Sequence, residues 1–381
     1  MPVYLDYNAT APVLPEAAAA VAAALQVVGN PSSVHGFGRA ARRVVEAARA
    51  DVAALVGVAP EQVVFTGSGT EAAQLALTGV GRTRRLVSAL EHAAVRSATP
   101  NAELIPATPE GVVDLAALER LLAADPTPTI VSLMLANNET GVIQPVAEAA
   151  ALAHRYGAVL HTDAVQAVGR IPVDLKTLGA DLLSLSAHKL GGPAGAGALV
   201  VRGDLALQPL IRGGGQERGR RGGTEATALL AGFGVAARSA RLALDHAPQI
   251  AYLLKEMEAA ALERCPDAAV IARGSLRLPN TSLLAVRGCR AETLVMALDL
   301  AGYAVSAGAA CSSGSVRSSA VLAAMGVPQD LADGAIRISL GPATTAADVA
   351  GFVDAWAAQV ARTRRSRSLA STPTSAAASV A

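Results

Sequence analysis

Cysteine is scarce in this sequence, and its scarcity excludes several kinds of fold and site. The chain of 381 residues has three cysteines, Cys265, Cys289 and Cys311. An odd and sparse set does not make a disulfide framework. Because no Cys-x-x-Cys pair occurs, a thiolate metal site is not expected, and no metal site is predicted. Each cysteine is therefore either a small buried residue or a reactive thiol.

Long apolar runs and a strong charge bias are also missing. No stretch reaches the roughly 18 uninterrupted apolar residues of a membrane span. The N-terminus lacks the basic and apolar stretches of a secretory signal. We therefore expect no membrane association and a cytoplasmic location. The net charge of +1 argues against nucleic acid or an anionic membrane as the main partner.

The composition is that of a large, well-packed protein. Hydrophobic residues make up 52% of the chain and charged residues 17%, which is enough apolar surface for a substantial core. The length suggests two packed domains, or one large domain with an appended lobe. Apolar strand candidates alternate with helical segments, as in a mostly parallel sheet covered on both faces. The strand candidates are residues 62–66, 85–88, 129–135, 158–162, 182–185 and 198–201.

The second part of the chain differs from the first. Residues 226–265 are predicted to form a nearly continuous helical connector, broken by Pro248. Strands are then expected at 281–286, 304–306 and 336–339, in a smaller α/β lobe. We predict a large domain over 13–245, a small domain over 1–12 and 246–365, and a disordered tail over 366–381, because that tail is rich in Ser, Ala, Thr and Pro.

One lysine stands where an apolar strand runs into a glycine-rich loop. Lys189 follows His188 and precedes Gly-Gly-Pro in a chain that otherwise favours arginine. Arginine does not deprotonate usefully, whereas a lysine in a shielded site forms a Schiff base. The alternative is an exposed loop lysine.

Asp163 closes the apolar strand that begins near residue 158. Ligands of open α/β sheets bind at the carboxyl ends of parallel strands. Asp163 is therefore either an ordinary helix cap or the partner of a protonated pyridine nitrogen. One strand–helix–strand unit separates it from Lys189, so both side chains can face the same pocket.

Two further stretches carry candidate chemistry. The Gly67–Gly69 turn lies between a strand and a helix, where backbone N–H groups cradle phosphate, but no Walker sequence follows. Cys311 lies among small and polar residues at 306–314, which is typical of a loop that presents a thiol, and its thiolate would be the nucleophile.

Together these motifs resemble one family, the cysteine desulfurases of the NifS/IscS type among the class V aminotransferases. The order and spacing of the motifs match the family over nearly the whole chain. They are YLDYNAT at 4–10, NPSSVH at 30–35, NNETG at 137–141, GGGQER at 213–218, GGT at 222–224 and IRISLG at 336–341. The resemblance implies an α/β fold of the type I, aspartate-aminotransferase-like class of pyridoxal-phosphate enzymes.

The resemblance also implies a role for each candidate residue. Lys189 would carry pyridoxal 5'-phosphate as a Schiff base and later move protons, and Cys311 would receive the sulfur. The ring would be held by Asp163 at the pyridine nitrogen, by Gln166 at the phenolic oxygen and by His92, which would stack on it and assist proton transfer. The remaining residues would bind phosphate or substrate. Phosphate would be bound by Gly69, Thr70, Ser186, His188 and, from the neighbouring subunit of a homodimer, Thr224. The substrate would be bound by Asn138, which also faces the cofactor, and by Arg337, which would pair with the carboxylate of the substrate.

The implied reaction converts L-cysteine to L-alanine. Lys189 removes the Cα proton, and the Cys311 thiolate attacks the substrate sulfur and keeps it as a persulfide. The long stretch between Cys311 and Met325 resembles the subgroup with an extended loop, which hands sulfur directly to an acceptor or scaffold protein, for iron–sulfur cluster assembly or thiolation. Cys311 could transiently contact such a cluster. The tail at 366–381 departs from the acidic, aromatic tail that other members use for docking.

Three alternatives remain open on the sequence alone. Another class V enzyme, an aminotransferase or lyase, would share Lys189 and Asp163 without needing Cys311. A selenocysteine lyase is a narrower variant of the same chemistry. A descendant that binds a partner without catalysis would form no Schiff base.

Overall fold

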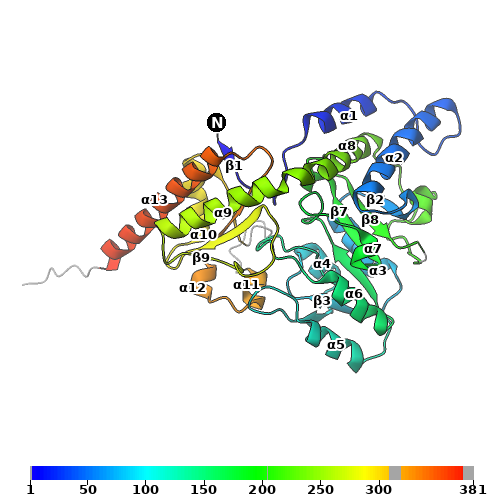
Figure 1. Cartoon of the computed structure of the whole chain (residues 1–381). Helices are drawn as coiled ribbons and strands as arrows, with labels where there is room; N and C mark the ends of the chain where they lie inside the picture. The colour runs from blue at the N-terminus through cyan, green and yellow to red at the C-terminus, as the bar shows by residue number, and fades with distance from the viewer. Residues whose placement is uncertain (1, 204, 309–318, 372–381) are drawn as a thin grey trace, which may run out of the picture.

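The computed structural model describes residues 2–203, 205–308 and 319–371, with the backbone alone from 366 onward. It has two parts joined by a long helical connector (Figure 1). The larger part is built on a seven-stranded sheet with the strand order β2-β8-β7-β6-β5-β3-β4, in which β8 alone runs against its neighbours. Its strands are β2 (Val63–Thr66), β3 (Arg84–Ser88), β4 (Glu103–Ile105), β5 (Thr129–Ser132), β6 (Val159–Asp163), β7 (Leu182–Ser186) and β8 (Gly197–Val201).

Helices cover both faces of this sheet, which explains why most of its strands are buried along their whole length. Alternate strand residues point to opposite faces, so that Val63 and Phe65 lie in one core cluster and Val64 lies in another. The first cluster lies under α2, α5, α6 and α8, and the second lies under α3. These helices and their neighbours are α1 (Pro15–Leu25), α2 (Gly36–Leu55), α3 (Gly69–Gly79), α4 (Ala93–Ala98), α5 (Leu115–Ala124), α6 (Val146–Arg155), α7 (Leu175–Leu178) and α8 (Thr227–Ala243).

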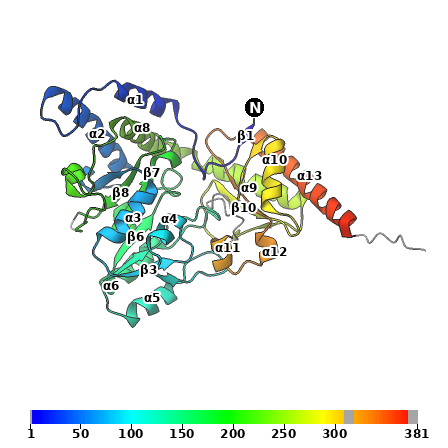
Figure 2. The same ribbon diagram turned by 180° about the vertical axis from the view of Figure 1, so that it is seen from behind.

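The smaller part is built on a four-stranded antiparallel sheet, in the order β12-β13-β10-β9. A separate apolar core lies between this sheet and its helices, with the fully buried Trp356 and Phe352 at its centre. From behind, this part and the large sheet lie on opposite sides of the molecule (Figure 2). Its elements are β9 (Ala269–Val270), β10 (Thr281–Ala285), β11 (Tyr303–Ala304), β12 (Ser306–Ala307), β13 (Ala335–Ser339), α9 (Ala247–Arg264), α10 (Ala291–Leu300), α11 (Ala320–Ala324), α12 (Gln329–Ala332) and α13 (Ala346–Ser371).

The connector is helical from Thr227 to Arg264, with a short 3-10 turn at Leu244–His246 between α8 and α9. The break therefore comes before Pro248, which lies in the first turn of α9, where proline is tolerated because no N–H is needed there. By length and composition alone, this stretch is long and apolar enough to cross a membrane, but the core helices of soluble proteins meet the same two criteria. Phe233 of α8 lies in the large core and Met257 of α9 in the small one.

The N-terminal segment crosses between the two parts. Strand β1 (Val3–Tyr4) pairs with β11, and Asp6 bridges to Ser339 of β13, so residues 3–6 belong to the small sheets. The chain then passes to the large part, where the N–H groups of Ala11 and Leu14 donate to carbonyls on either side of Lys189. The domain boundaries at 12/13 and 245/246 stay a prediction that this arrangement supports.

Some elements of the structure were not predicted from the sequence, and others differ in their bounds from the prediction. The expected strand at 304–306 is two short strands that pair with different partners, β1 and β13. Strand β4 was missed because it is a three-residue edge strand in which Glu103 and Leu104 are exposed, so it lacks an apolar pattern. Helix α13 continues to Ser371, which corrects the disordered tail that was expected from residue 366; its Arg, Leu and Ala residues favour a helix. Residues 372–381 lie outside the described residues.

A buried hydrogen bond joins the two parts near residue 319. Ser319 caps α11 of the small part and donates its hydroxyl to the Glu139 carboxylate, 2.5 Å away in the large part. Burial raises the pKa of Glu139 from its ordinary value of 4.5 to about 7, although the Ser319 hydrogen bond and the charges of Arg337 and His92 lower it. The folded protein therefore holds a proton at Glu139 that the unfolded chain releases at lower pH.

This difference predicts a pH-dependent stability. Because the folded pKa is the higher one, the stabilisation is complete below about pH 4.5 and is lost as the pH rises through about 7. The loss is on the order of 3 kcal/mol. We expect Glu139→Gln to flatten the fall in the thermal unfolding midpoint between about pH 5 and pH 8. Glu256→Gln, at an exposed position of α9, is the control. If the unfolding midpoint of Glu139→Gln fell with pH as steeply as that of the wild type, Glu139 would not be the group that holds the proton.

Candidate active site

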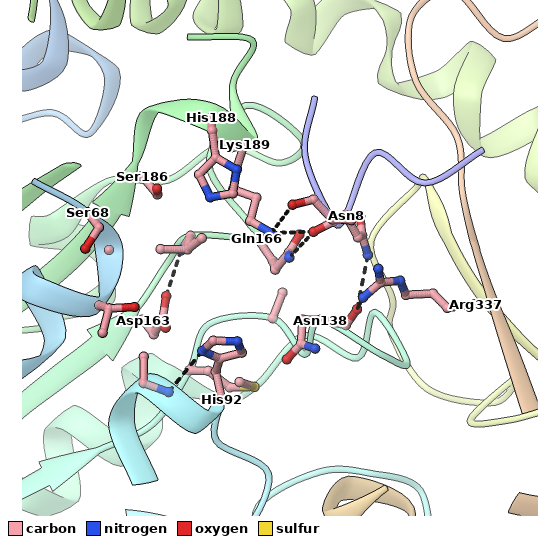
Figure 3. Close-up of a pocket in the computed structure, with 17 residues that line it drawn as sticks. Asn8, Ser68, His92, Asn138, Asp163, Gln166, Ser186, His188, Lys189 and Arg337 are labelled. Atoms are coloured by element: carbon pink, nitrogen blue, oxygen red, sulfur yellow. Dashed lines mark hydrogen bonds between the residues drawn. The ribbon is translucent and has the colours of Figure 1, made fainter. Parts of the chain in front are cut away.

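A cavity of about 320 Å³ lies at the carboxyl ends of β6 and β7, where the two parts meet. Most of the residues predicted from the sequence line it. Figure 3 shows Ser68 and Ser186 at one end of the cavity, Arg337 at the other, and Lys189 across from His92. The predicted residues that line it are Gly69, Thr70, His92, Asn138, Asp163, Gln166, Ser186, His188, Lys189 and Arg337.

The N-terminus of α3 forms one end of the cavity. Ser68 caps the helix by accepting a hydrogen bond from the Glu71 N–H, so the first turn presents its remaining N–H groups. A side chain at Gly69 would crowd Val165 and Ser186, at 3.1 and 3.3 Å. A side chain at Gly197 of β8 would lie 2.5 Å from the Ser68 carbonyl carbon. The glycines therefore keep an open cradle for an anion at this helix start.

His188 borders the same end of the cavity. Burial and the nearby charge of Lys189 lower the pKa of His188 to about 4. Its Nδ1 atom lies 3.2 Å from the Thr10 hydroxyl. The imidazole is therefore neutral and can donate one hydrogen bond to a phosphate oxygen.

Asp163 is the last residue of β6, and its side chain is only 9% exposed. One carboxylate oxygen accepts the Val165 N–H at 2.9 Å. Burial raises its pKa, while the nearby His92 and Lys189 lower it. Next to it on β6, the fully buried His161 lies within hydrogen-bond distance of Ser132 and Ser184 on the two neighbouring strands and fixes the strand ends. Burial lowers the pKa of His161 to about 3, so it is neutral there.

His92 lies between β3 and α4. Its Nδ1 atom accepts the Ala94 N–H at 3.1 Å and so caps α4. The preceding residue, Glu91, is 3% exposed and accepts the Met134 N–H. Burial and the nearby Asp163 raise the pKa of Glu91 well above its ordinary value, which favours its protonated form.

Lys189 ends the short turn that follows β7. Its Nζ atom donates to the main-chain carbonyls of Asn8 and Ala9, the latter at 2.9 Å. The Asn8 carbonyl also accepts the Gln166 amide at 2.9 Å. The Arg170 guanidinium donates to the Gln166 side-chain oxygen and thereby orients the amide. One main-chain oxygen thus fixes both a predicted Schiff-base lysine and a predicted ring-binding glutamine.

Arg337 of β13 forms the far end of the cavity and is 2% exposed. It donates to the Asn138 carbonyl at 3.0 Å and to the Asp6 carboxylate at 2.8 Å. The Asn138 carbonyl also accepts the side-chain amide of Asn8, at 3.3 Å. The two predicted substrate-binding residues therefore lie in contact with each other.

One predicted site residue among those that the structure describes does not line the cavity. Thr224 is exposed, in the loop before α8. That loop is anchored by a buried ion pair, in which the Arg49 guanidinium of α2 donates hydrogen bonds to both carboxylate oxygens of Glu217, at 2.6 and 2.8 Å. A second pair, Arg221 with Glu71, ties it to the start of α3. Cys311 lies outside the described residues.

The other two cysteines are buried in the small core, as a small apolar residue would be. Among residues 2–203, 205–308 and 319–371, no cluster of three His, Cys, Asp or Glu side chains could hold a metal ion.

The cavity fits pyridoxal phosphate. An open helix start suits a phosphate, and Lys189 supplies the amine that the cofactor's aldehyde needs. The buried Asp163 carboxylate bonds only a backbone N–H in the contacts described above, and a protonated ring nitrogen would neutralise it.

Sequence reasoning missed Asn8, Asp6 and Glu91. Asn8 and Asp6 belong to the YLDYNAT motif and Glu91 immediately precedes His92, so each was part of a recognised stretch without an assigned role. Their contacts reach across 43 to 331 positions of the chain, and no local pattern reports such distant partners.

Comparisons with known proteins, like the geometry of the cavity, indicate an enzyme that uses pyridoxal phosphate. The family Aminotransferase class-V matches residues 3–352. A protein named cysteine desulfurase from Cereibacter sphaeroides is 46% identical over 91% of this chain and 92% of its own length. One named cysteine desulfurase IscS from Dictyoglomus turgidum is 40% identical over 91% of both chains. The NifS-like protein of Rickettsia africae superposes with a TM-score of 0.89, at 34% identity over 95% of this chain and all of the other.

These matches confirm the α/β fold class and the resemblance that the motifs predicted. The chain belongs to the class V aminotransferase family, whose members are enzymes that depend on pyridoxal phosphate.

Proposed function

We propose that this chain is a cysteine desulfurase that converts L-cysteine to L-alanine and passes the sulfur on through Cys311. The observation that carries the proposal is that Lys189, Asp163 and Arg337 converge on one cavity. An amine, a buried carboxylate and a buried guanidinium are the groups needed to hold this cofactor and an amino-acid substrate together. The relatives named cysteine desulfurase, which match over most of the chain, support this choice among class V activities.

The cofactor would lie along the cavity with its phosphate at the start of α3. Ser186 and His188 would add contacts to those of Gly69 and Thr70. Asp163 would hold the ring nitrogen in its protonated form. Bound in this way, pyridoxal phosphate supplies an electron sink for the carbanion that forms at the substrate Cα atom.

Further side chains would fix the ring and the substrate. Gln166, oriented by Arg170, would donate its amide to the phenolic oxygen, and the His92 ring would lie against the ring face. Asn138 would face both cofactor and substrate, and Arg337 would bind the substrate carboxylate by a charge-assisted pair of hydrogen bonds.

Lys189 would move the protons of the reaction. Once its amine is freed from the cofactor, it is placed to take the Cα proton of the substrate and to return a proton to the product. The carbonyls of Asn8 and Ala9 accept hydrogen bonds from Nζ, so they would hold the amine close to the reacting carbon when it carries the extra proton.

Sulfur transfer would be a displacement at the substrate sulfur. The Cys311 thiolate attacks that sulfur, an S–S bond forms and the Cβ–S bond breaks. The electron pair of the broken bond stays with the carbon, which takes a proton and becomes the methyl group of alanine. Cys311 is thereby oxidised to a persulfide and the carbon is reduced, so no external oxidant is needed.

The persulfide would next pass its outer sulfur to an acceptor or scaffold protein, for iron–sulfur cluster assembly or thiolation. A brief contact between Cys311 and a cluster under assembly is part of this proposal. We place the enzyme in the cytoplasm, where thiols are kept reduced and Cys311 stays available as a nucleophile.

A homodimer would complete the phosphate site through Thr224. Large apolar side chains remain exposed on Val34, Phe37 and Ile211. Ile211 accepts a hydrogen bond from the Gly222 N–H and so lies beside Thr224. In the proposed homodimer, a second copy would cover the surface around Ile211, and Thr224 would reach its neighbour's cofactor.

The role of Lys189 is tested by trapping the cofactor. After borohydride reduction, we expect the cofactor to remain on the peptide that contains Lys189 when the digest is examined by mass spectrometry. Lys189→Ala should lose both this adduct and at least about a thousandfold of turnover. Lys176→Ala, on an exposed helix position, is the matched control. Retained turnover in Lys189→Ala would contradict the role.

The role of Cys311 is tested by following sulfur. After addition of L-cysteine, the peptide carrying Cys311 should gain the mass of one sulfur atom. Cys311→Ser should form neither this species nor sulfide, yet should still bind cofactor and substrate. Cys265→Ala, a change in the small core, should keep the activity. Full turnover by Cys311→Ser would favour another class V activity, such as an aminotransferase.

The role of Thr224 across the dimer is tested by mixing two inactive variants. If Thr224 serves the neighbouring subunit, Thr224→Ala and Lys189→Ala chains form mixed dimers with one intact site. Refolding them together should then restore about a quarter of the wild-type activity, because half of the dimers are mixed and each has one working site of two. Should Thr224 act within its own chain, the mixture would stay as inactive as its components.

A further inference from the structure

The guanidinium of Arg337 is held on two sides by hydrogen bonds. Its Nη2 atom donates to the Asp6 carboxylate at 2.8 Å, and its Nη1 atom donates to the Asn138 carbonyl at 3.0 Å. Its Nε atom is buried without a hydrogen-bond partner among the residues that the structure describes. A buried N–H without a partner is costly, and a ligand acceptor bound at Arg337 would relieve this cost.

Asp6 is itself fixed from two directions. Its second carboxylate oxygen accepts the Ser306 hydroxyl at 2.7 Å. Ser306 of β12 pairs directly with Arg337 of β13, so donor and guanidinium belong to the same sheet. The Asp6 backbone bridges to Ser339 and its carbonyl accepts the Tyr4 hydroxyl. Asp6 is therefore a rigid partner of Arg337, unlike a mobile surface ion pair.

These contacts determine how Arg337 can meet a carboxylate. A guanidinium has five N–H groups in a fixed plane, and a carboxylate needs two of them along one edge. Asp6 takes one hydrogen of Nη2 and keeps the plane from turning. The part of the guanidinium that borders the cavity is then held in one orientation.

We propose that Asp6 is a positioning residue that turns Arg337 toward the substrate carboxylate and so makes the site select α-amino carboxylates over simple amines. The proposal rests on the proposed function of the cavity. It attributes to Asp6 an orienting role, in addition to the charge that it supplies.

The orienting role distinguishes two substitutions. Asp6→Asn keeps an oxygen that accepts from Nη2 but removes the negative charge, which otherwise opposes a substrate carboxylate. Asp6→Ala removes the acceptor and frees the guanidinium to turn. We therefore expect Asp6→Asn to bind α-amino carboxylates about as well as the wild type, and Asp6→Ala to bind them at least about tenfold more weakly.

The test measures binding to the holoenzyme from changes in its visible absorption. L-Alanine and ethylamine are compared as ligands, since they differ only in the carboxylate. In Asp6→Ala, the dissociation constant for L-alanine should rise about tenfold or more, while that for ethylamine should stay within about threefold. Asp354→Ala on α13, which removes an exposed partner of Arg264, is the matched control and should change neither constant.

Ser306→Ala provides a second, milder variant in case Asp6→Ala does not fold. It frees one oxygen of Asp6 without changing a charge, and we expect a rise of about threefold for L-alanine alone. Equal losses for both ligands, or unchanged L-alanine binding in Asp6→Ala and Ser306→Ala, would overturn the proposal. Turnover of L-cysteine by the wild type is measured separately: its absence would refute the proposed function, while the two dissociation constants would still decide the role of Asp6.

Discussion

The carbonyl oxygen of Asn8 is the contact on which the rest of the site depends. It accepts hydrogen bonds from both Lys189 and Gln166. The same residue is 1% exposed, and its side-chain amide donates to the Asn138 carbonyl and to the Thr281 hydroxyl. Asn8 therefore joins the large sheet, the turn that carries Asn138 and the small sheet at one point. A shift of this residue would displace the amine and the substrate-binding end together.

The cavity contains few charges, because its buried titratable neighbours are neutral. Burial holds His161 and His188 without a proton and Glu91 with one, through pKa values displaced in opposite directions. The charges that remain at the cavity are those with a proposed task, namely Asp163, Lys189 and Arg337. In such surroundings each charge acts strongly on a bound ligand, because little water screens it.

Much of this site could be predicted from the sequence, for identifiable reasons. Asp163 and Lys189 follow apolar strands, and parallel strands bring their carboxyl ends together, so local pattern and topology place both residues. The roles of Asp6 and Asn8 were not predicted, because these residues follow a strand of only two residues and their partners lie far along the chain. The helix at Ser366–Ser371 was missed for a related reason: its composition resembles a tail, while the helix that it extends is anchored by Trp356 in the small core.

The place of the N-terminal segment also affects how the molecule is assembled in the cell. Residues 3–8 leave the ribosome about 300 residues before Tyr303, Ala304 and Ser339, with which they pair. The large sheet can fold early from neighbouring strands, whereas the substrate end must wait until β13 has emerged. A chain that ends before β13 therefore lacks the arginine that would hold an amino acid, and catalytic competence arises only after this late strand has joined the N-terminal segment.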